Sequence, residues 1–179
     1  LNLPLTAILL LWINMITDGA PALAYCVDPY GTDVMYRKPK PRDEGILPVS
    51  KLTLIGILGT VGTAIALVLF SLHGGGGDNS DEIIRARTLV FNFVVLYEVI
   101  LVFAIRLGFH VPFFSNKWVW MSVVLSIALQ ALLMYTPLHA VFKIAPLNMQ
   151  ELGALSLSGI AFFFAFLVYN FFGVRSSKR

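Results

Sequence analysis

The chain has 179 residues, of which 58% are hydrophobic and only 13% are charged, and its mean hydropathy is +0.80. This composition provides too little polar surface for a water-soluble domain, so we expect an integral membrane protein. The formal net charge of +3 does not indicate a nucleic-acid partner, because the basic residues gather in connections between apolar stretches, where they report membrane orientation.

Five apolar stretches are long enough to cross a bilayer as helices, since a span needs about 20 mostly apolar residues. They cover approximately residues 3–25, 52–72, 88–105, 118–136 and 152–173. The second, fourth and fifth carry no charge, whereas the first contains Asp18 and the third contains Glu98. The sequence therefore predicts an all-α membrane protein, a bundle of five transmembrane helices, with two acids inside the lipid.

The first stretch combines an amide, a hydroxyl and a carboxylate, Asn14, Thr17 and Asp18, with a helix-breaking Gly19 and Pro21. A carboxylate near the middle of a span costs about 2.5 to 3.5 kcal/mol even on lenient insertion scales, so it usually binds or relays an ion. Pro21 cannot donate a hydrogen bond to the Thr17 carbonyl. We therefore expect the first helix to be unwound near Asp18 and Gly19, as in transporter ion sites.

The basic residues of the connections predict the orientation of the chain. Arg85, Arg87 and Lys143 fall on one side of the predicted bundle. The other basic residues fall on the opposite side: Arg37, Lys38, Lys40, Arg42, Lys51, Arg106, Lys117, Arg175, Lys178 and Arg179. By the positive-inside rule, the amino end is expected outside or in a lumen and the carboxyl tail in the cytosol. The chain begins directly in an apolar stretch without a signal-peptide pattern, so we expect it to be part of a longer protein.

The other spans carry residues that favour helix packing. Gly56, Gly59 and Gly62 recur every three residues in the second stretch, which indicates a narrow face for close helix approach. Asn92 and Gln130 are interpreted as partners in hydrogen bonds between helices. Neither set is assigned a ligand.

The polar groups of the first and third spans form a candidate metal site. Asn14, Thr17 and Asp18 stand at i, i+3 and i+4, so an intact helix presents them on one side. Glu98 lies midway along the third span and can meet them inside a bundle. Carboxylate, amide and hydroxyl oxygens suit a divalent cation such as calcium, which takes about 6 to 8 oxygen ligands. The alternative, that Asp18 and Glu98 are structural groups pinning helices together, stays open at this point.

Other chemistries are not indicated. Zinc or copper favours His or Cys ligands, whereas the histidines all lie in the predicted connections. No nucleotide-binding loop or catalytic triad pattern is present. The sequence therefore predicts no catalytic residues.

Several motifs resemble the carboxyl-terminal half of P-type calcium ATPases of the sarco/endoplasmic reticulum kind. The run from Leu11 to Ala24, LWINMITDGAPALA, is similar to the sixth span of such pumps. Further similar segments are Leu96-Tyr97-Glu98-Val99, Trp118 onward, and Tyr135-Thr136-Pro137-Leu138. Essentially the whole chain is similar to spans six to ten of ten. Secretory-pathway pumps tend to have Met where Thr17 stands, so the comparison favours the reticulum type.

By this resemblance, Asn14, Thr17, Asp18 and Glu98 occupy cation-ligand positions and calcium is the transported ion. ATP and Mg²⁺ would act only through domains absent from this chain, which lacks the phosphorylated aspartate motif and should be inactive alone. The implied partners are the amino-terminal spans and cytosolic domains of the same pump, and the lipid bilayer. The alternatives are a non-transporting membrane scaffold or regulatory subunit with the same helix packing, or a pump for sodium, protons or manganese.

Overall fold

The computed structural model describes residues 2–29, 31, 34–36, 49–108 and 111–176, and these residues form helices and connections without a β-strand. The elements in chain order are α1 (Ala7–Trp12), the π-helical η1 (Ile13–Thr17), α2 (Gly19–Tyr25), the 3₁₀-helical η2 (Val34–Tyr36), α3 (Val49–Leu72), α4 (Ser80–Gly108), α5 (Lys117–Tyr135), α6 (Leu138–Phe142) and α7 (Met149–Ser176). The predicted five-helix membrane architecture is confirmed, because five helical segments are long and apolar enough to span a bilayer.

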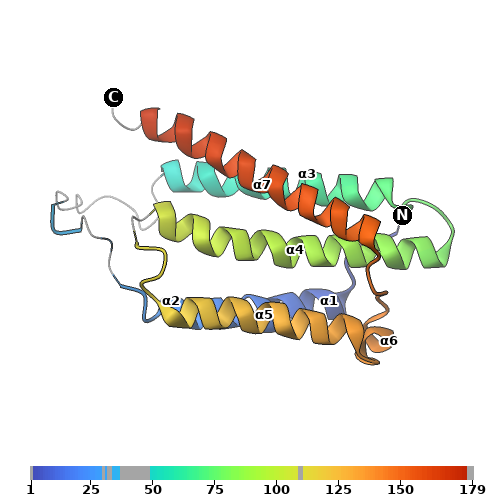
Figure 1. Cartoon of the computed structure of the whole chain (residues 1–179). Coiled ribbons are helices and arrows are strands. Elements are labelled where there is room, and N and C mark those ends of the chain that lie inside the picture. The colour runs from blue at the N-terminus through green and yellow to red at the C-terminus, as the bar shows by residue number, and fades with distance from the viewer. Residues whose placement is uncertain (1, 30, 32–33, 37–48, 109–110, 177–179) are drawn as a thin grey trace.

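The spans are arranged in two layers (Figure 1). The helices α3, α4 and α7 pack on one another in one layer, while the first span, α1–η1–α2, lies beside α5 in the other. The segment η1 packs against α4 and so joins the layers. We name the two ends of the bundle after residues. Helices α2 and α4 end at the Arg106 end. The connection between α3 and α4, which contains Gly74–Gly77, lies at the Asn2 end.

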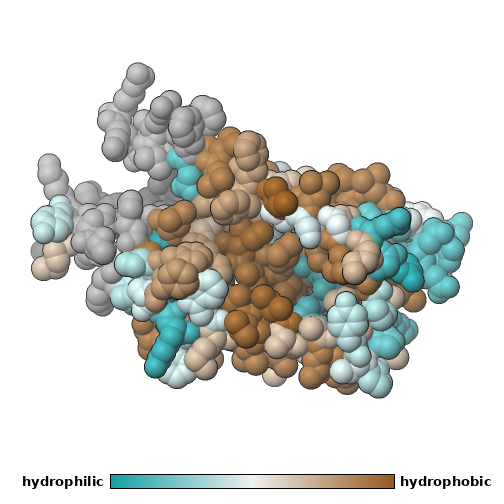
Figure 2. Space-filling view, in the orientation of Figure 1, coloured by the Kyte–Doolittle hydropathy of each residue, from teal (hydrophilic) through white to brown (hydrophobic). Residues whose placement is uncertain are grey.

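The outer surface is apolar between these two ends. Figure 2 shows brown side chains across the middle of the visible face and teal ones gathered toward the ends. Large hydrophobic side chains such as Leu72, Val124 and Leu157 are more than half exposed. This distribution fits helices whose outer faces contact lipid.

Capping residues determine where α4 and α7 begin. The Asn148 side chain accepts a hydrogen bond from the Glu151 N–H (2.9 Å), and the Glu151 carboxylate accepts one from the Asn148 N–H (2.7 Å). This reciprocal pair is a capping box, which satisfies two backbone donors at a helix start. Asn79 accepts a bond from the Asp81 N–H at the start of α4 (3.1 Å). Helix α4 therefore begins at Ser80, eight residues before the predicted span.

Polar and small side chains fasten the helices to one another. Gln130 of α5 donates to the Asn92 Oδ1 of α4 over 3.1 Å, so the predicted interhelical hydrogen bond is confirmed. Gly62 lies against Phe162 of α7, whereas Gly56 and Gly59 have no described neighbour at the position a Cβ would take. Of the three glycines on the small-residue face of α3, Gly62 is thus the one that packs against another helix in the described part of the chain.

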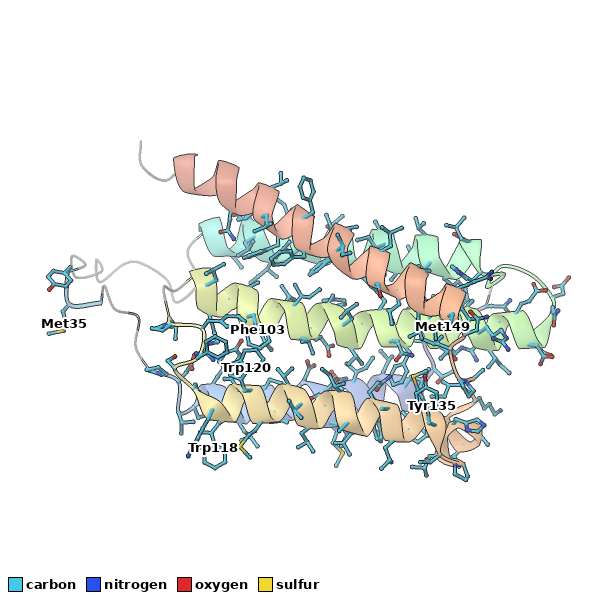
Figure 3. The ribbon with its side chains drawn as sticks, in the orientation of Figure 1. Met35, Phe103, Trp118, Trp120, Tyr135 and Met149 are labelled. Atoms are coloured by element: carbon cyan, nitrogen blue, oxygen red, sulfur yellow. The ribbon has the colours of Figure 1, made fainter. Side chains whose placement is uncertain are left out.

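The tryptophans at the start of α5 take different positions. Figure 3 shows Trp118 pointing away from the bundle, and half of its surface is exposed. Trp120 instead packs on Phe103 of α4, with ring centroids 4.8 Å apart. Amphipathic rings at a span end are typical of the interface between lipid and water. Most basic residues of the first connection, which carried the orientation prediction, lie outside the described residues.

Candidate cation site

The first span contains a π-helical turn directly before its carboxylate. Residues Ile13–Thr17 form η1, and the Asp18 N–H donates to the Ile13 carbonyl five residues earlier (3.0 Å). The α-helix resumes with α2, where the Ala22 N–H donates to the Asp18 carbonyl (3.1 Å). The predicted unwinding near Asp18 and Gly19 is therefore not found: the helix stays wound there, and the irregularity is a wider turn over Ile13–Thr17, directly before Asp18. Such π turns occur frequently at functional sites.

Thr17 links the first span to α4. It is buried, with 3% of its surface exposed, and its hydroxyl lies 2.9 Å from the Ile13 carbonyl oxygen. The same hydroxyl lies 3.0 Å from the Glu98 Oε2 on α4. The structure thus brings together two of the predicted site residues from spans that are 81 residues apart in the chain.

The hydroxyl of Thr17 has one hydrogen but two neighbouring oxygens. If Glu98 is ionised, the Ile13 carbonyl and the carboxylate compete for that hydrogen. If Glu98 carries a proton, its O–H donates to the Thr17 oxygen while Thr17 donates to Ile13, and both contacts are hydrogen bonds. Both contacts of the Thr17 hydroxyl are full hydrogen bonds at the same time only when Glu98 carries a proton.

Asp18 and Glu98 line the same groove between the first span and α4. The groove has a volume of about 300 Å³ and is otherwise mainly apolar. Its lining residues are Thr17, Asp18, Pro21, Ala22, Tyr25, Val95, Glu98, Val99, Leu101, Val102 and Ile105. Two carboxylates in such surroundings repel each other more strongly than they would in water. A bound cation or a proton relieves this repulsion.

Asn14 is not brought into the groove. Its side chain is exposed on the first span and does not belong to the lining, whereas Asp18 is exposed and lines it. Within the part of the chain that the structure describes, no group of three or more His, Cys, Asp or Glu side chains gathers. Asp18, Glu98 and Thr17 therefore offer at most five side-chain oxygens in this groove, which is fewer than the roughly 6 to 8 that calcium takes. The Tyr25 hydroxyl also lies in the lining, but it donates to the Val102 carbonyl.

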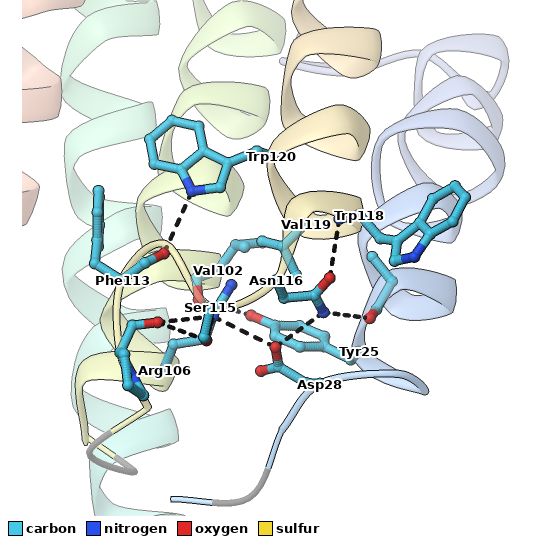
Figure 4. A network of polar contacts seen from close by, with 12 residues as sticks. Tyr25, Asp28, Val102, Arg106, Phe113, Ser115, Asn116, Trp118, Val119 and Trp120 are labelled. Atoms are coloured by element: carbon cyan, nitrogen blue, oxygen red, sulfur yellow. Dashed lines mark hydrogen bonds and ion pairs between the residues drawn. The ribbon is translucent and has the colours of Figure 1, made fainter.

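Sequence reasoning missed a polar network at the Arg106 end of the bundle (Figure 4). There Asp28 follows α2, Arg106 lies in the last turn of α4, and Asn116 precedes α5. Asp28 accepts a hydrogen bond from Asn116 and forms an ion pair with Arg106. Two signals were available in the sequence. Opposite charges follow the first and third spans, and an asparagine stands directly before the fourth, where it is a preferred helix cap.

Comparison with known proteins identifies the family. A family described as "Cation transporting ATPase, C-terminus" matches residues 2–172. The calcium-transporting ATPase 1 of Yarrowia lipolytica is 32% identical over 162 residues, which are 86% of this chain and 17% of that protein. The calcium-transporting ATPase of Bacillus subtilis is 34% identical over 144 residues, or 76% of this chain and 16% of that protein.

The type 2C member 2 calcium-transporting ATPase of Rattus norvegicus is 29% identical over 163 residues, covering 88% of this chain and 17% of that protein. The chain thus spans about a sixth of the length of these curated relatives. Since they include type 2C proteins, the reticulum subtype stays a prediction. The match over residues 2–172 nevertheless shows that this chain belongs to the family of carboxyl-terminal regions of cation-transporting ATPases.

Proposed function

We propose that this chain is the carboxyl-terminal membrane part of an ATP-driven calcium pump, and that Asp18, Glu98 and Thr17 supply part of its intramembrane calcium site. The observation that carries the proposal is the shared groove, in which two carboxyls from different spans meet beside a buried hydroxyl. Intramembrane acids are costly and mark ion pathways. The names of the similar proteins, all calcium-transporting ATPases, support calcium as the ion.

The remaining ligands would come from outside the described groove. Calcium takes about 6 to 8 oxygens, and the side chains of Asp18, Glu98 and Thr17 offer at most five. Asn14 would add an amide oxygen from the exposed side of η1. The amino-terminal spans of the same pump would cover that side and complete the coordination. These spans and the cytosolic domains are the proposed partners, together with the lipid bilayer.

Protons would travel against calcium in this scheme. When calcium leaves, a proton on Glu98 removes one negative charge from the groove and completes the hydrogen bonds of Thr17. Phosphorylation by ATP and Mg²⁺ in domains outside this chain would drive the change. The amino end would lie outside or in a lumen and the Arg106 end in the cytosol, as the basic residues of the connections indicate.

The test replaces the carboxylates in the complete pump that contains this chain. In Asp18→Asn and Glu98→Gln, we expect the calcium concentration for half-maximal phosphorylation by ATP to rise by roughly 100-fold or more. The complete pump would bury these carboxylates against calcium, and removing one partner of a buried charge pair costs about 3–5 kcal/mol. The matched control is Asp81→Asn, which neutralises an exposed carboxylate at the start of α4. Calcium dependence equal to wild type in Asp18→Asn would show that this residue is not a ligand.

Uptake into vesicles separates the proposal from its rivals. Radioactive calcium should accumulate in an ATP-dependent manner and resist competition by sodium. Stronger competition by manganese, or uptake of sodium instead, would change the assigned ion. A complete protein that is never phosphorylated by ATP would instead support a membrane scaffold with the same helix packing.

A further inference from the structure

Four side chains connect the last turn of the first span to α4 and α5. They are Tyr25 at the end of α2, Asp28 just after it, Arg106 near the end of α4, and Asn116 before α5 (Figure 4). We call these four residues the polar clamp. They lie at the Arg106 end of the bundle, one short helix away from Asp18.

Asn116 connects two helix ends with one amide. Its Oδ1 accepts from the Trp118 N–H over 2.9 Å and so caps the start of α5. Its Nδ2 donates to the Ala24 carbonyl of α2 over 3.0 Å and to the Asp28 Oδ1 over 2.9 Å. The side chain is buried, with 4% of the residue exposed. Moving α2 relative to α5 would therefore leave buried polar groups unpaired, which is costly.

Arg106 holds the segment after α2. Its Nη2 lies 3.4 Å from the Asp28 Oδ1 and donates to the Ser115 Oγ over 2.8 Å and to the Pro112 carbonyl over 3.1 Å. Only 2% of the residue is exposed, and its Nε and Nη1 have no hydrogen-bond partner among the described residues. A buried guanidinium with two unpaired nitrogens depends strongly on a neighbouring negative charge. The Asp28 carboxylate supplies that charge.

Tyr25 connects the clamp directly to the groove. Its hydroxyl donates to the Val102 carbonyl of α4 over 2.7 Å, and both residues line the groove that contains Asp18 and Glu98. Val102 lies one helical turn after Glu98, on the same side of α4. The first span thus contacts α4 through hydrogen bonds at two levels, one at Thr17 and one at Tyr25.

We propose that the polar clamp positions the proposed calcium site by fixing the rotation and depth of α2. Helix α2, seven residues or about 10 Å long, transmits the position of its clamped end to Asp18 at its start. The π turn that precedes Asp18 separates α2 from α1, so α1 does not hold this rotation by continuous α-helical bonding. The clamp residues act through α2 and are positioning residues, and the inference rests on the proposed calcium site.

The test measures calcium-dependent phosphorylation of the complete pump, separating half-saturating calcium from the maximal level. Tyr25→Phe removes only the hydroxyl, and we expect about a fivefold rise in half-saturating calcium with an unchanged maximum, the size of one neutral hydrogen bond. Asn116→Asp keeps the oxygen that caps α5 but loses the two hydrogen bonds that Asn116 donates to Ala24 and Asp28. We therefore expect half-saturating calcium to rise about tenfold or more. Ser158→Ala is the matched control, because this buried hydroxyl bonds only the Leu155 carbonyl of its own helix.

Each outcome decides the inference. Wild-type half-saturating calcium in Tyr25→Phe, or a lowered maximum without any shift, would overturn the positioning role. If Asn116→Asp fails to accumulate in the membrane, the result for Tyr25→Phe alone decides whether the polar clamp positions the calcium site. Asp18→Asn in the same assay distinguishes the two proposals: if it has no effect, the calcium site itself is wrong, whereas an effect of Asp18→Asn without one of Tyr25→Phe rejects only the clamp.

Discussion

At the residue scale, Thr17 has a larger role than the sequence indicated. The sequence presented it as one neutral oxygen beside two stronger candidates, Asn14 and Asp18. In the structure Thr17 is buried and its hydroxyl lies between the Ile13 carbonyl and the Glu98 carboxyl, while Asn14 faces outward. A single hydroxyl therefore joins the π turn of the first span to the acid of α4.

Replacing Thr17 tests this connection. Thr17→Val keeps the shape of the side chain but removes the oxygen that Thr17 offers to calcium in the proposed site, so we expect half-saturating calcium to rise about five- to tenfold. Thr17→Ser keeps the hydroxyl and should stay near wild type. Thr60→Val in α3 is a matched control, because it removes an exposed hydroxyl that bonds its own helix at the Gly56 carbonyl. Equal calcium dependence of Thr17→Val and wild type would contradict the role of the hydroxyl.

At the element scale, the contact between α4 and α7 depends on a glycine. A Cβ at Gly159 would lie 2.6 Å from the Leu96 Cδ2 and 3.3 Å from the Leu96 Cγ. Leu96 belongs to the helix that carries Glu98, two residues further on. The glycine therefore lets α7 pack closely behind the part of α4 that contributes to the groove.

A methyl group at this contact should loosen the pair of helices. We expect Gly159→Ala to be about 1 kcal/mol or more less stable than Gly153→Ala, since overpacking typically costs about 1–3 kcal/mol and both variants share the gain in helix propensity. Thermal unfolding in detergent measures the loss. Gly153→Ala, in the same helix but with no heavy atom within 4 Å of its added Cβ, should show none. A similar unfolding temperature for both variants would mean that Leu96 moves aside without cost.

At the scale of the whole molecule, the groove lies where the two helical layers meet. Helices α3, α4 and α7 form one layer and the first span with α5 forms the other, with η1 against α4 between them. The groove thus contains proposed ligands from both layers. Asn14 and Asp18 are both exposed, but Asn14 lies outside the groove whereas Asp18 lines it.

This arrangement predicts that the chain alone is an incomplete site. Purified in detergent, it should show no saturable calcium binding at micromolar concentrations by isothermal titration, because Asp18, Glu98 and Thr17 offer fewer oxygens than calcium takes. The complete pump, prepared in the same detergent, is the positive control. Stoichiometric micromolar binding by the chain alone would show that it needs no ligands from other spans.

The sequence alone determined the number of spans and the two acids within them, and it predicted an irregularity in the first helix close to the π turn that the structure shows. In lipid a span must satisfy its own backbone hydrogen bonds, so an apolar stretch of sufficient length forms a helix whatever its neighbours are. The effect of Pro21 on backbone hydrogen bonding is likewise local, because it is confined to one turn. Tertiary structure decided that Thr17 rather than Asn14 meets Glu98, that Gly159 contacts Leu96, and that Asn116 bridges α2 and α5. These spans are apolar on all sides, so no amphipathic stripe marks the face that turns inward. Only packing against the neighbouring helices determines that face.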